Sequence, residues 1–288
     1  MSSWILGVGL SHDASACLLR DGSPMVGVQL ERLTGRKRDG RKELAHLMID
    51  YCLTAAAISF RDLDAVGVSF PDVYVPDDMF LPHFDSSAKN VLHVGHHLAH
   101  AYSAFAPSEF DEAAVLVIDG HGDSYYESDE DRLVWGNDLW AGLKVEESSR
   151  RDLGIAPRSE VESIYTFDRQ RPPSLAKRNF MGWGRRANRH RGPTVNVGIG
   201  ANYKFASSVL FGPGEHSGKV MGLAPYGTAR QDLVKSYWLT DSGDLVLDDL
   251  WRHQVRKEVH DQPDLPANRE WAAGLAAYVQ RETAELGP

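Results

Sequence analysis

Short apolar runs separated by glycines and polar turns fill the first part of the chain. Three of these runs predict buried strands, at residues 5–10, 14–19 and 24–30. Asp21-Gly22 lies between the last two and is a strong signal for a tight turn between strands. Apolar residues at helical spacing follow over 41–57, and another short apolar run covers 63–68. We therefore expect the order strand, strand, strand, helix, strand.

The pattern resumes after an irregular segment. Residues 72–86 are rich in proline, aspartate and aromatic residues without a period, so we expect a loop there, near the mouth of a cleft. Further short strands are predicted at residues 91–94, 113–119, 124–126, 132–134 and 162–167. Helices are predicted at residues 96–105, 202–211 and 271–286. The pattern restarts after Pro107, which indicates a first lobe over residues 1–107 and a second over 108–288 of an α/β chain.

Composition narrows the classes of partner. Lysine and arginine number 31 against 40 aspartates and glutamates, a net charge of −9, which argues against non-specific nucleic-acid binding as the main role. Basic residues still cluster between Lys177 and Arg191, around Trp183. This cluster predicts either an exposed loop with solvated charges or a contact to a polyanion or phosphate.

Cysteine use and the amino terminus bear on the compartment. Cys17 and Cys52 each lie inside an apolar stretch, so we expect two core thiols, no disulfide framework and a reducing environment. The first residues lack the basic segment of a signal peptide, and no apolar run approaches the roughly 18 residues of a membrane helix. We expect a cytoplasmic protein without a membrane partner.

The most informative chemistry lies at residues 96–119. His96 and His100 are four apart, so on a helix they project from one face, and Asp119 closes a short apolar strand. Two histidines and a carboxylate form an open facial set that suits Fe(II), although Zn(II) or Mn(II) could occupy it. The alternative is ordinary surface or core polarity. His97 points to another helix face, and the second position holds no glutamate, so a zinc peptidase would lack its general base.

Two glycine-containing segments are weaker candidates. In residues 7–15 a tight turn of small and polar residues could bring backbone amides to a phosphate, and His12 beside Asp13 could transfer a proton or simply stabilise the turn. Residues 218–227 combine Lys219 with three glycines but lack the spacing of a Walker loop. This second segment is either an anion contact or an ordinary junction from helix to loop.

Taken in order, these motifs resemble a known family. The resemblance rests on Ser11-His12-Asp13-Ala14-Ser15 with Asp21-Gly22, Glu31-Arg32-Leu33 with residues 36–40, residues 96–101, Asp119-Gly120 with Gly122-Asp123, and residues 219–227. The chain looks like the amino-terminal domain of antibiotic and nodulation-factor O-carbamoyltransferases. The resemblance implies a two-lobed, actin-like ATPase (ribonuclease H-like) fold, related to the domain that makes threonylcarbamoyladenosine in tRNA.

The resemblance also implies an activity. A carboxy-terminal domain would use carbamoyl phosphate and ATP to make carbamoyl adenylate. The amino-terminal domain would pass the carbamoyl group to a hydroxyl of a small-molecule natural product, as in antibiotic biosynthesis. His96, His100 and Asp119 would be metal ligands that hold the phosphate of the adenylate, and His12 or Asp13 would accept the hydroxyl proton. The nucleotide would be bound by Ser11, Gly120, Gly122, Lys219, Gly222 and Gly227.

The chain departs from the family pattern in two places. Residues 136–196 match it poorly and are expected to be an insertion around the acceptor site. A glycine-rich segment, a further aspartate ligand and the adenylate-forming domain have no counterpart here, so we expect a fragment or one half of a split pair, with a truncated second lobe. Two other classes stay open: a non-catalytic binding or regulatory subunit, and a sugar or acetate kinase of the same fold.

Overall fold

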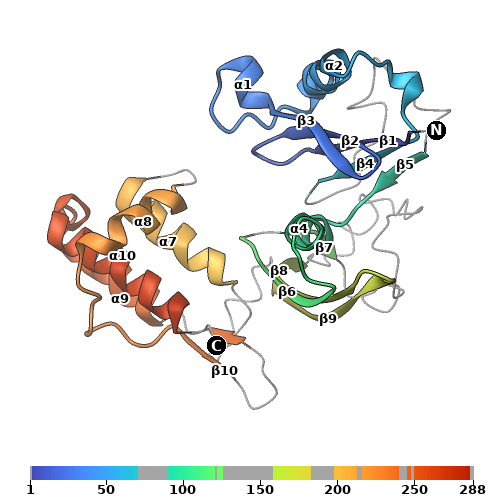
Figure 1. The fold of residues 1–288 in the computed structure, drawn as a ribbon. Helices are drawn as coiled ribbons and strands as arrows, with labels where there is room; N and C mark the ends of the chain where they lie inside the picture. Colours follow the sequence, from blue (N-terminus) through green and yellow to red (C-terminus); the bar gives the residue numbers. More distant parts are fainter. Residues whose placement is uncertain are drawn as a thin grey trace, which may run out of the picture. The chain divides into compact units, whose positions relative to one another are not determined.

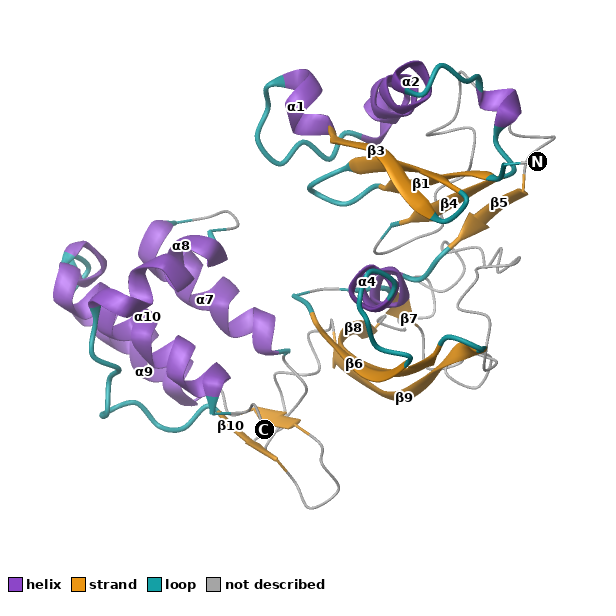
Figure 2. Cartoon of the chain, in the orientation of Figure 1, coloured by secondary structure: helices purple, strands orange, loops and turns teal. Residues whose placement is uncertain are grey.

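The computed structural model describes most of the chain (Figure 1). The described residues are 2–70, 90–120, 122–125, 158–182, 198–212, 216–239, 245–247 and 250–285. Two compact units divide the chain. Residues 1–117, 122–155 and 164–176 make up the first, and residues 118–121, 156–163 and 177–288 make up the second. Strands and helices are mixed along the chain, which confirms the expected α/β class (Figure 2).

A five-stranded sheet organises the first unit. Its strands are β1 (Trp4–Gly9), β2 (Ser15–Arg20), β3 (Ser23–Gln29), β4 (Ala65–Ser69) and β5 (Asn90–His93), in the spatial order β3-β2-β1-β4-β5. β1, β2 and β3 are antiparallel neighbours, whereas β4 is parallel to both β1 and β5. Asp21 and Gly22, with φ of 51° and 80°, form the tight turn between β2 and β3. The predicted meander is confirmed.

One face of this sheet is covered by α2 (Ala45–Ala55). Short helices α1 (Leu30–Thr34), η1 (Lys42–Leu44) and η2 (Phe60–Asp62) flank it. Alternate residues of β2, Ala16 and Leu18, are buried in the same core as Met48, Ile49 and Cys52 of α2. Burial raises the pKa of the Cys52 thiol to about 11, so it behaves as a small apolar side chain, as predicted. Cys17 is half-buried, and both thiols are free.

A second sheet carries α4 (His96–Phe105). Its strands are β6 (Glu112–Ile118), β7 (Ser124–Tyr125), β8 (Arg158–Asp168) and β9 (Arg171–Gly182), and β8 pairs with the other three. Leu98, Ala101 and Phe105 of α4 pack against Val117 of β6 and against Tyr165 and Phe167 of β8. The predicted helix has these bounds, and the predicted strands at 113–119 and 162–167 correspond to β6 and part of β8.

The β8–β9 hairpin corrects one prediction. Arg178, expected in an exposed loop or at a polyanion, lies in β9, where its Nε is 2.6 Å from Glu160 Oε1. The side chains of Arg178 and Glu160 are 6% and 1% exposed, so this charge is committed to a buried ion pair. Residues 158–182 of the predicted insertion form this hairpin. The basic residues beyond 182, like the predicted loop at 72–86 and strand at 132–134, lie outside the described residues.

Helices form the core of the second unit. They are α7 (Ile199–Phe211), α8 (Ser217–Leu223), α9 (Leu250–Asp261) and α10 (Arg269–Ala284), with the short η4 (Ala224–Tyr226) and η5 (Leu265–Ala267) and the hairpin of β10 (Tyr237–Leu239) and β11 (Leu245–Leu247). Trp251, Leu275 and Tyr278 are completely buried in their shared core. Helices α7 and α10 were predicted; α9 was not. In the part of the chain that the structure covers, no helix has the length and apolarity to cross a membrane.

Truncation of the core of α2 tests this packing. Ile49 is fully buried, and we expect Ile49→Ala to lower the free energy of unfolding by about 2–5 kcal/mol, because the lost contacts leave a cavity. Leu47, on the same helix but 36% exposed, is the matched control, and Leu47→Ala should cost less than about 1 kcal/mol. Urea unfolding followed by circular dichroism measures both. Equal losses would contradict the assignment of the buried face.

Candidate metal centre

The two predicted histidine ligands lie on one face of α4. The helix begins at His96 after Gly95, and Leu98, Ala101 and Phe105 are buried on the side that packs on the second sheet. His96 and His100 are one turn apart on the helix. Their rings are nearly perpendicular, at 83°, with centroids 4.6 Å apart. The two Nε2 atoms are 3.2 Å apart, so both rings present the same nitrogen to one point.

The predicted carboxylate follows β6 directly. Asp119 continues the pairing with β8, because its backbone N–H donates to Val161 O at 2.9 Å. Its side chain turns back on the chain, and Oδ1 accepts the N–H of Gly120 at 2.6 Å. One carboxylate oxygen is thus held by the local backbone. This arrangement fixes the direction of the carboxylate at the end of the strand.

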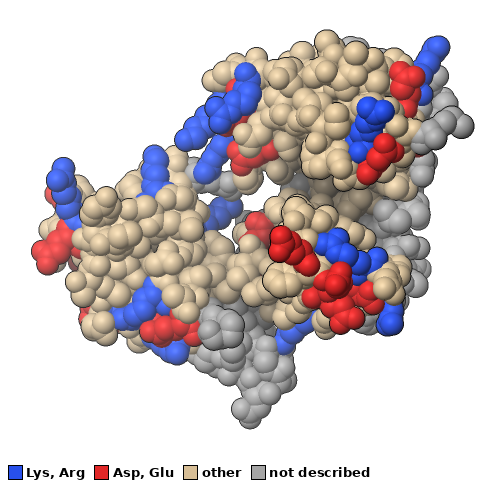
Figure 3. Space-filling model, in the orientation of Figure 1, with Lys and Arg blue, Asp and Glu red and all other residues tan. Residues whose placement is uncertain are grey.

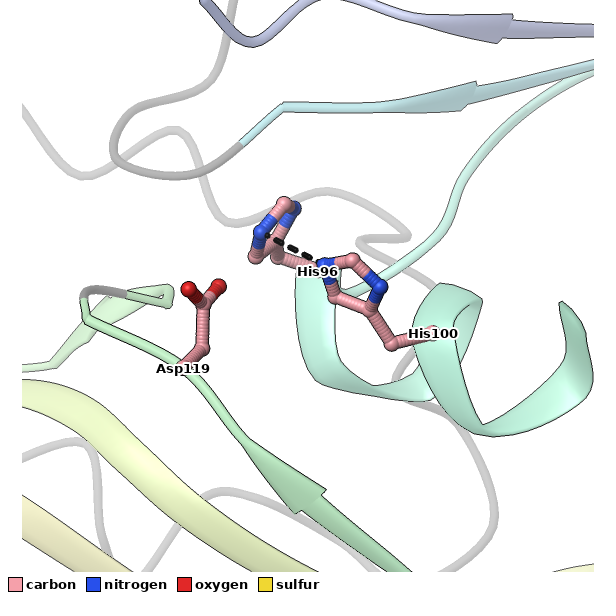
Figure 4. A group of neighbouring side chains, drawn as sticks. All are labelled: His96, His100 and Asp119. Carbon is pink, nitrogen blue, oxygen red and sulfur yellow. Dashed lines mark hydrogen bonds between the residues drawn. The ribbon is translucent and has the colours of Figure 1, made fainter. Parts of the chain in front are cut away.

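The structure brings all three residues together (Figure 4). One ligand atom from each of His96, His100 and Asp119 lies within 4.8 Å of the others. Figure 4 shows the imidazoles on α4 and the carboxylate at the end of β6 directed toward a common space. Two nitrogens bound about 2.1 Å from one ion at tetrahedral or octahedral angles would be about 3.0–3.4 Å apart. The observed 3.2 Å separation, with a nitrogen and oxygen donor set, fits a divalent transition metal.

Two residues close to the ligands in the sequence, His97 and Asp123, are buried. His97 is completely buried, on a different face of α4 from His96 and His100, as predicted. Asp123 is also buried, at 2% exposure, and its Oδ2 accepts the backbone N–H of His96 at 2.8 Å. Sequence reasoning placed Asp123 in a motif but gave it no role. The available signal was Gly95, which has no side chain with which to cap the helix.

His12 and Asp13 lie in the turn between β1 and β2. Nδ1 of His12 is 2.5 Å from Asp13 Oδ2, with the side chains 62% and 39% exposed. Gly40 packs directly against this turn. A Cβ on Gly40 would lie 2.7 Å from the carbonyl oxygen of Ser11 and 3.0 Å from Cα of His12. Only glycine permits that approach. The predicted residues Ser11, His12 and Asp13 therefore occupy one supported and accessible turn.

A basic segment adjoins the same turn. Ala14 N–H donates to Asp39 O at 3.1 Å. The buried Asp39 carboxylate is held by Arg41, whose hydrogen bonds keep the pKa of Asp39 well below its usual range. Figure 3 shows Lys and Arg side chains gathered around α1. The basic residues of α1 and the segment after it are Arg32, Arg36, Lys37 and Arg38.

The remaining predicted residues fall into two groups. Lys219 and Gly222 lie exposed on α8, and Gly227 follows η4, where a Cβ would lie 2.2 Å from the backbone of Ala273 in α10. That close crossing explains Gly227 by packing alone. Gly120 and Gly122 belong to the segment of Asp119 and Asp123.

Gly200 connects α7 with the segment that carries Asp119. A Cβ on Gly200 would lie 2.8 Å from Cα and 2.9 Å from N of Gly120, and 3.0 Å from the carbonyl oxygen of Asp119. At the start of the same helix, Glu162 Oε1 accepts the N–H of Ile199 at 2.8 Å. The first turn of α7 thus lies directly on the backbone of a candidate ligand, and a glycine is what allows this.

The comparisons with known proteins identify the family. A family model described as "Carbamoyltransferase N-terminus" matches residues 4–82 and 79–244. The chain therefore belongs to the carbamoyltransferase family, and the match lies on the amino-terminal part of that family's proteins. The resemblance inferred from the ordered motifs is confirmed, and family membership supports the actin-like fold that it implied.

Two curated proteins are similar to the chain in sequence. Nodulation protein NolNO of Sinorhizobium fredii is 31% identical over 260 residues, which cover 81% of this chain and 31% of that protein. The uncharacterized protein sll1178 of Synechocystis is 30% identical over 224 residues, which cover 56% of this chain and 35% of that protein. The chain thus spans about a third of the length of these relatives.

The solved structures that resemble the chain are remote in sequence. YeaZ from Pseudomonas aeruginosa is 14% identical with a TM-score of 0.35, over 67% of this chain and 71% of that one. The activator of 2-hydroxyisocaproyl-CoA dehydratase from Clostridium difficile, with bound ADPNP, is 9% identical with a TM-score of 0.44, over 100% of this chain and 77% of that one.

Substitution of Gly200 tests the contact with the segment of Asp119. We expect Gly200→Ala to lower the free energy of unfolding by about 1–3 kcal/mol, because the new methyl meets backbone atoms that cannot give way. Gly218 in α8 is the matched control, since a Cβ there has nothing within 4 Å, and Gly218→Ala should leave stability unchanged or slightly raised. Thermal unfolding compares the two. A Gly200→Ala protein as stable as Gly218→Ala would show that the contact is absent.

Proposed function

We propose that this chain is the amino-terminal part of a metal-dependent O-carbamoyltransferase that carbamoylates a hydroxyl of a small-molecule natural product. Membership of the carbamoyltransferase family supports the transfer chemistry. The convergence of His96, His100 and Asp119 is the observation that carries the metal dependence. Fe(II) is the preferred ion for this donor set, with Zn(II) and Mn(II) as alternatives.

The proposed donor is carbamoyl adenylate. It would be made from carbamoyl phosphate and ATP by an adenylate-forming domain or separate subunit, since this chain spans only about a third of its curated relatives. The basic side chains around α1 favour an anionic donor despite the net charge of −9.

The exposure of the three ligands fits a catalytic role, because a catalytic metal site keeps a position open for substrate. His100 is exposed and His96 and Asp119 are half-buried, so the space that they face admits a ligand from outside. A metal bound there would hold phosphate oxygens of the donor and offset the negative charge that collects on the leaving AMP.

Proton transfer is assigned to the β1–β2 turn. The acceptor hydroxyl attacks the carbamoyl carbon, the bond from that carbon to the phosphate oxygen breaks, and the hydroxyl proton passes to a base. His12 fits this role because Asp13 Oδ2, 2.5 Å from Nδ1, orients the ring and favours the tautomer in which Nε2 accepts the proton. Asp13 is the second candidate for the same role.

Reconstitution tests the proposed function. The chain is mixed with a separately produced adenylate-forming domain, ATP, carbamoyl phosphate, Fe(II) and a panel of polyhydroxylated acceptors, and mass spectrometry follows carbamate products. We expect a metal-dependent product, and Asp119→Asn should slow its formation at least about 100-fold, because a ligand that supports charge stabilisation is lost. His253→Ala, an exposed histidine of α9, is the control and should retain the rate.

Other outcomes assign other functions. Absence of any metal-dependent carbamate would contradict the proposal. A phosphorylated acceptor formed from ATP without carbamoyl phosphate would indicate a small-molecule kinase of the same fold. Unaltered carbamoyl transfer by the assembly after both His96→Ala and His100→Ala would indicate a non-catalytic binding or regulatory subunit.

A further inference from the structure

We propose that Asp123 is a positioning residue of the metal centre, which fixes the start of α4 and so sets His96 and His100 against Asp119. The inference rests on the proposed metal-binding function of those three residues. It assigns Asp123 no contact with metal or substrate. Its role is to hold the helix that carries two ligands on the segment that carries the third.

The start of α4 lacks a cap of its own. The first residues of any helix have backbone N–H groups without partners inside the helix, and a side chain at the N-cap position usually accepts one of them. The N-cap of α4 is Gly95, which makes no side-chain hydrogen bond. Asp123 replaces it from 27 positions away, with Oδ2 2.8 Å from the N–H of His96.

The physical setting makes this bond strong. Asp123 is 2% exposed, so water does not compete for its carboxylate. A carboxylate at a helix N-terminus also faces the positive end of the helix dipole. A charge-assisted bond to a backbone N–H is shorter and stronger than a bond between neutral groups. One partner of Asp123 is the backbone of a candidate ligand.

The hydrogen bond from the His96 N–H to Asp123 links the helix that carries two ligands to the segment that follows the third. Asp123 comes four positions after Asp119 in the sequence, and Asp119 is itself tied to β8 through Val161 O. The apolar contacts of Leu98, Ala101 and Phe105 hold α4 on the sheet. Asp123 adds a polar contact to the first backbone N–H of the helix. Outer partners of metal ligands act in this way, and their loss typically costs about 10–100-fold in metal affinity.

Mn(II) binding to the full chain tests the inference, with the dissociation constant measured by titration and electron paramagnetic resonance. We expect Asp123→Ala to weaken Mn(II) binding about 10–100-fold. Asp123→Asn should weaken binding less than Asp123→Ala, because asparagine keeps an oxygen that accepts the N–H but loses the charge. Asp123→Glu keeps the charge but lengthens the side chain, and it should weaken binding more than Asp123→Asn.

Asn268→Ala is the matched control. Asn268 caps α10 by accepting the N–H groups of Glu270 and Trp271, and α10 carries no candidate ligand. This variant should have a lower melting temperature with unchanged Mn(II) affinity. The resonance spectrum of bound Mn(II) should also broaden in Asp123→Ala but not in Asn268→Ala.

The possible results distinguish failure of the proposed metal centre from failure of the positioning role of Asp123. Unmodified chain that binds no Mn(II), Fe(II) or Zn(II) would overturn the proposed metal centre and this inference with it. Mn(II) bound equally well by the unmodified chain and a folded Asp123→Ala would overturn the positioning role alone. If Asp123→Ala does not fold, the comparison of Asp123→Glu with Asp123→Asn decides, and weaker binding by Asp123→Asn would contradict the inference.

Discussion

Packing of α4 on the second sheet is the interaction on which the candidate site depends. Phe105 stacks on Phe167 with ring centroids 4.6 Å apart, and Tyr102 meets the same ring edge-on at 5.2 Å. Aromatic pairs of this kind add about 0.5–1.5 kcal/mol to the burial of their area. Because this apolar contact fixes which face of α4 turns to the sheet, it also fixes the face that carries His96 and His100.

Polar and backbone contacts then fix the parts of the site that this apolar packing does not position. The strand pairing of Asp119 with Val161 places the carboxylate, and Gly200 allows α7 to lie on the same backbone. Asp123 holds the first turn of α4 at its His96 end. The ligands themselves stay accessible, which is what a site that exchanges substrate requires. Buried apolar and backbone contacts therefore stabilise the fold, whereas the candidate ligands are accessible side chains.

Local patterns predicted much of this arrangement. Alternating apolar residues and Asp21-Gly22 gave β1–β3, and the spacing of His96 and His100 gave their common face. The sequence did not reveal β9, because its buried Arg178 satisfies its charge through Glu160 rather than through solvent. Nor did it reveal α9, which is polar apart from a few buried positions such as Trp251 and Val255. The role of Asp123 depends on a contact 27 positions away, which no local pattern encodes.

The central claim is that His96, His100 and Asp119 bind one metal ion, and metal content tests it most directly. The chain is loaded with Fe(II) under anaerobic conditions, desalted and analysed for metals together with Asp119→Ala and with His253→Ala, which alters an exposed histidine outside the cluster. We predict about one ion per chain in the unmodified protein and in His253→Ala, and a loss of most of it in Asp119→Ala. Equal metal content in all three proteins would contradict the account.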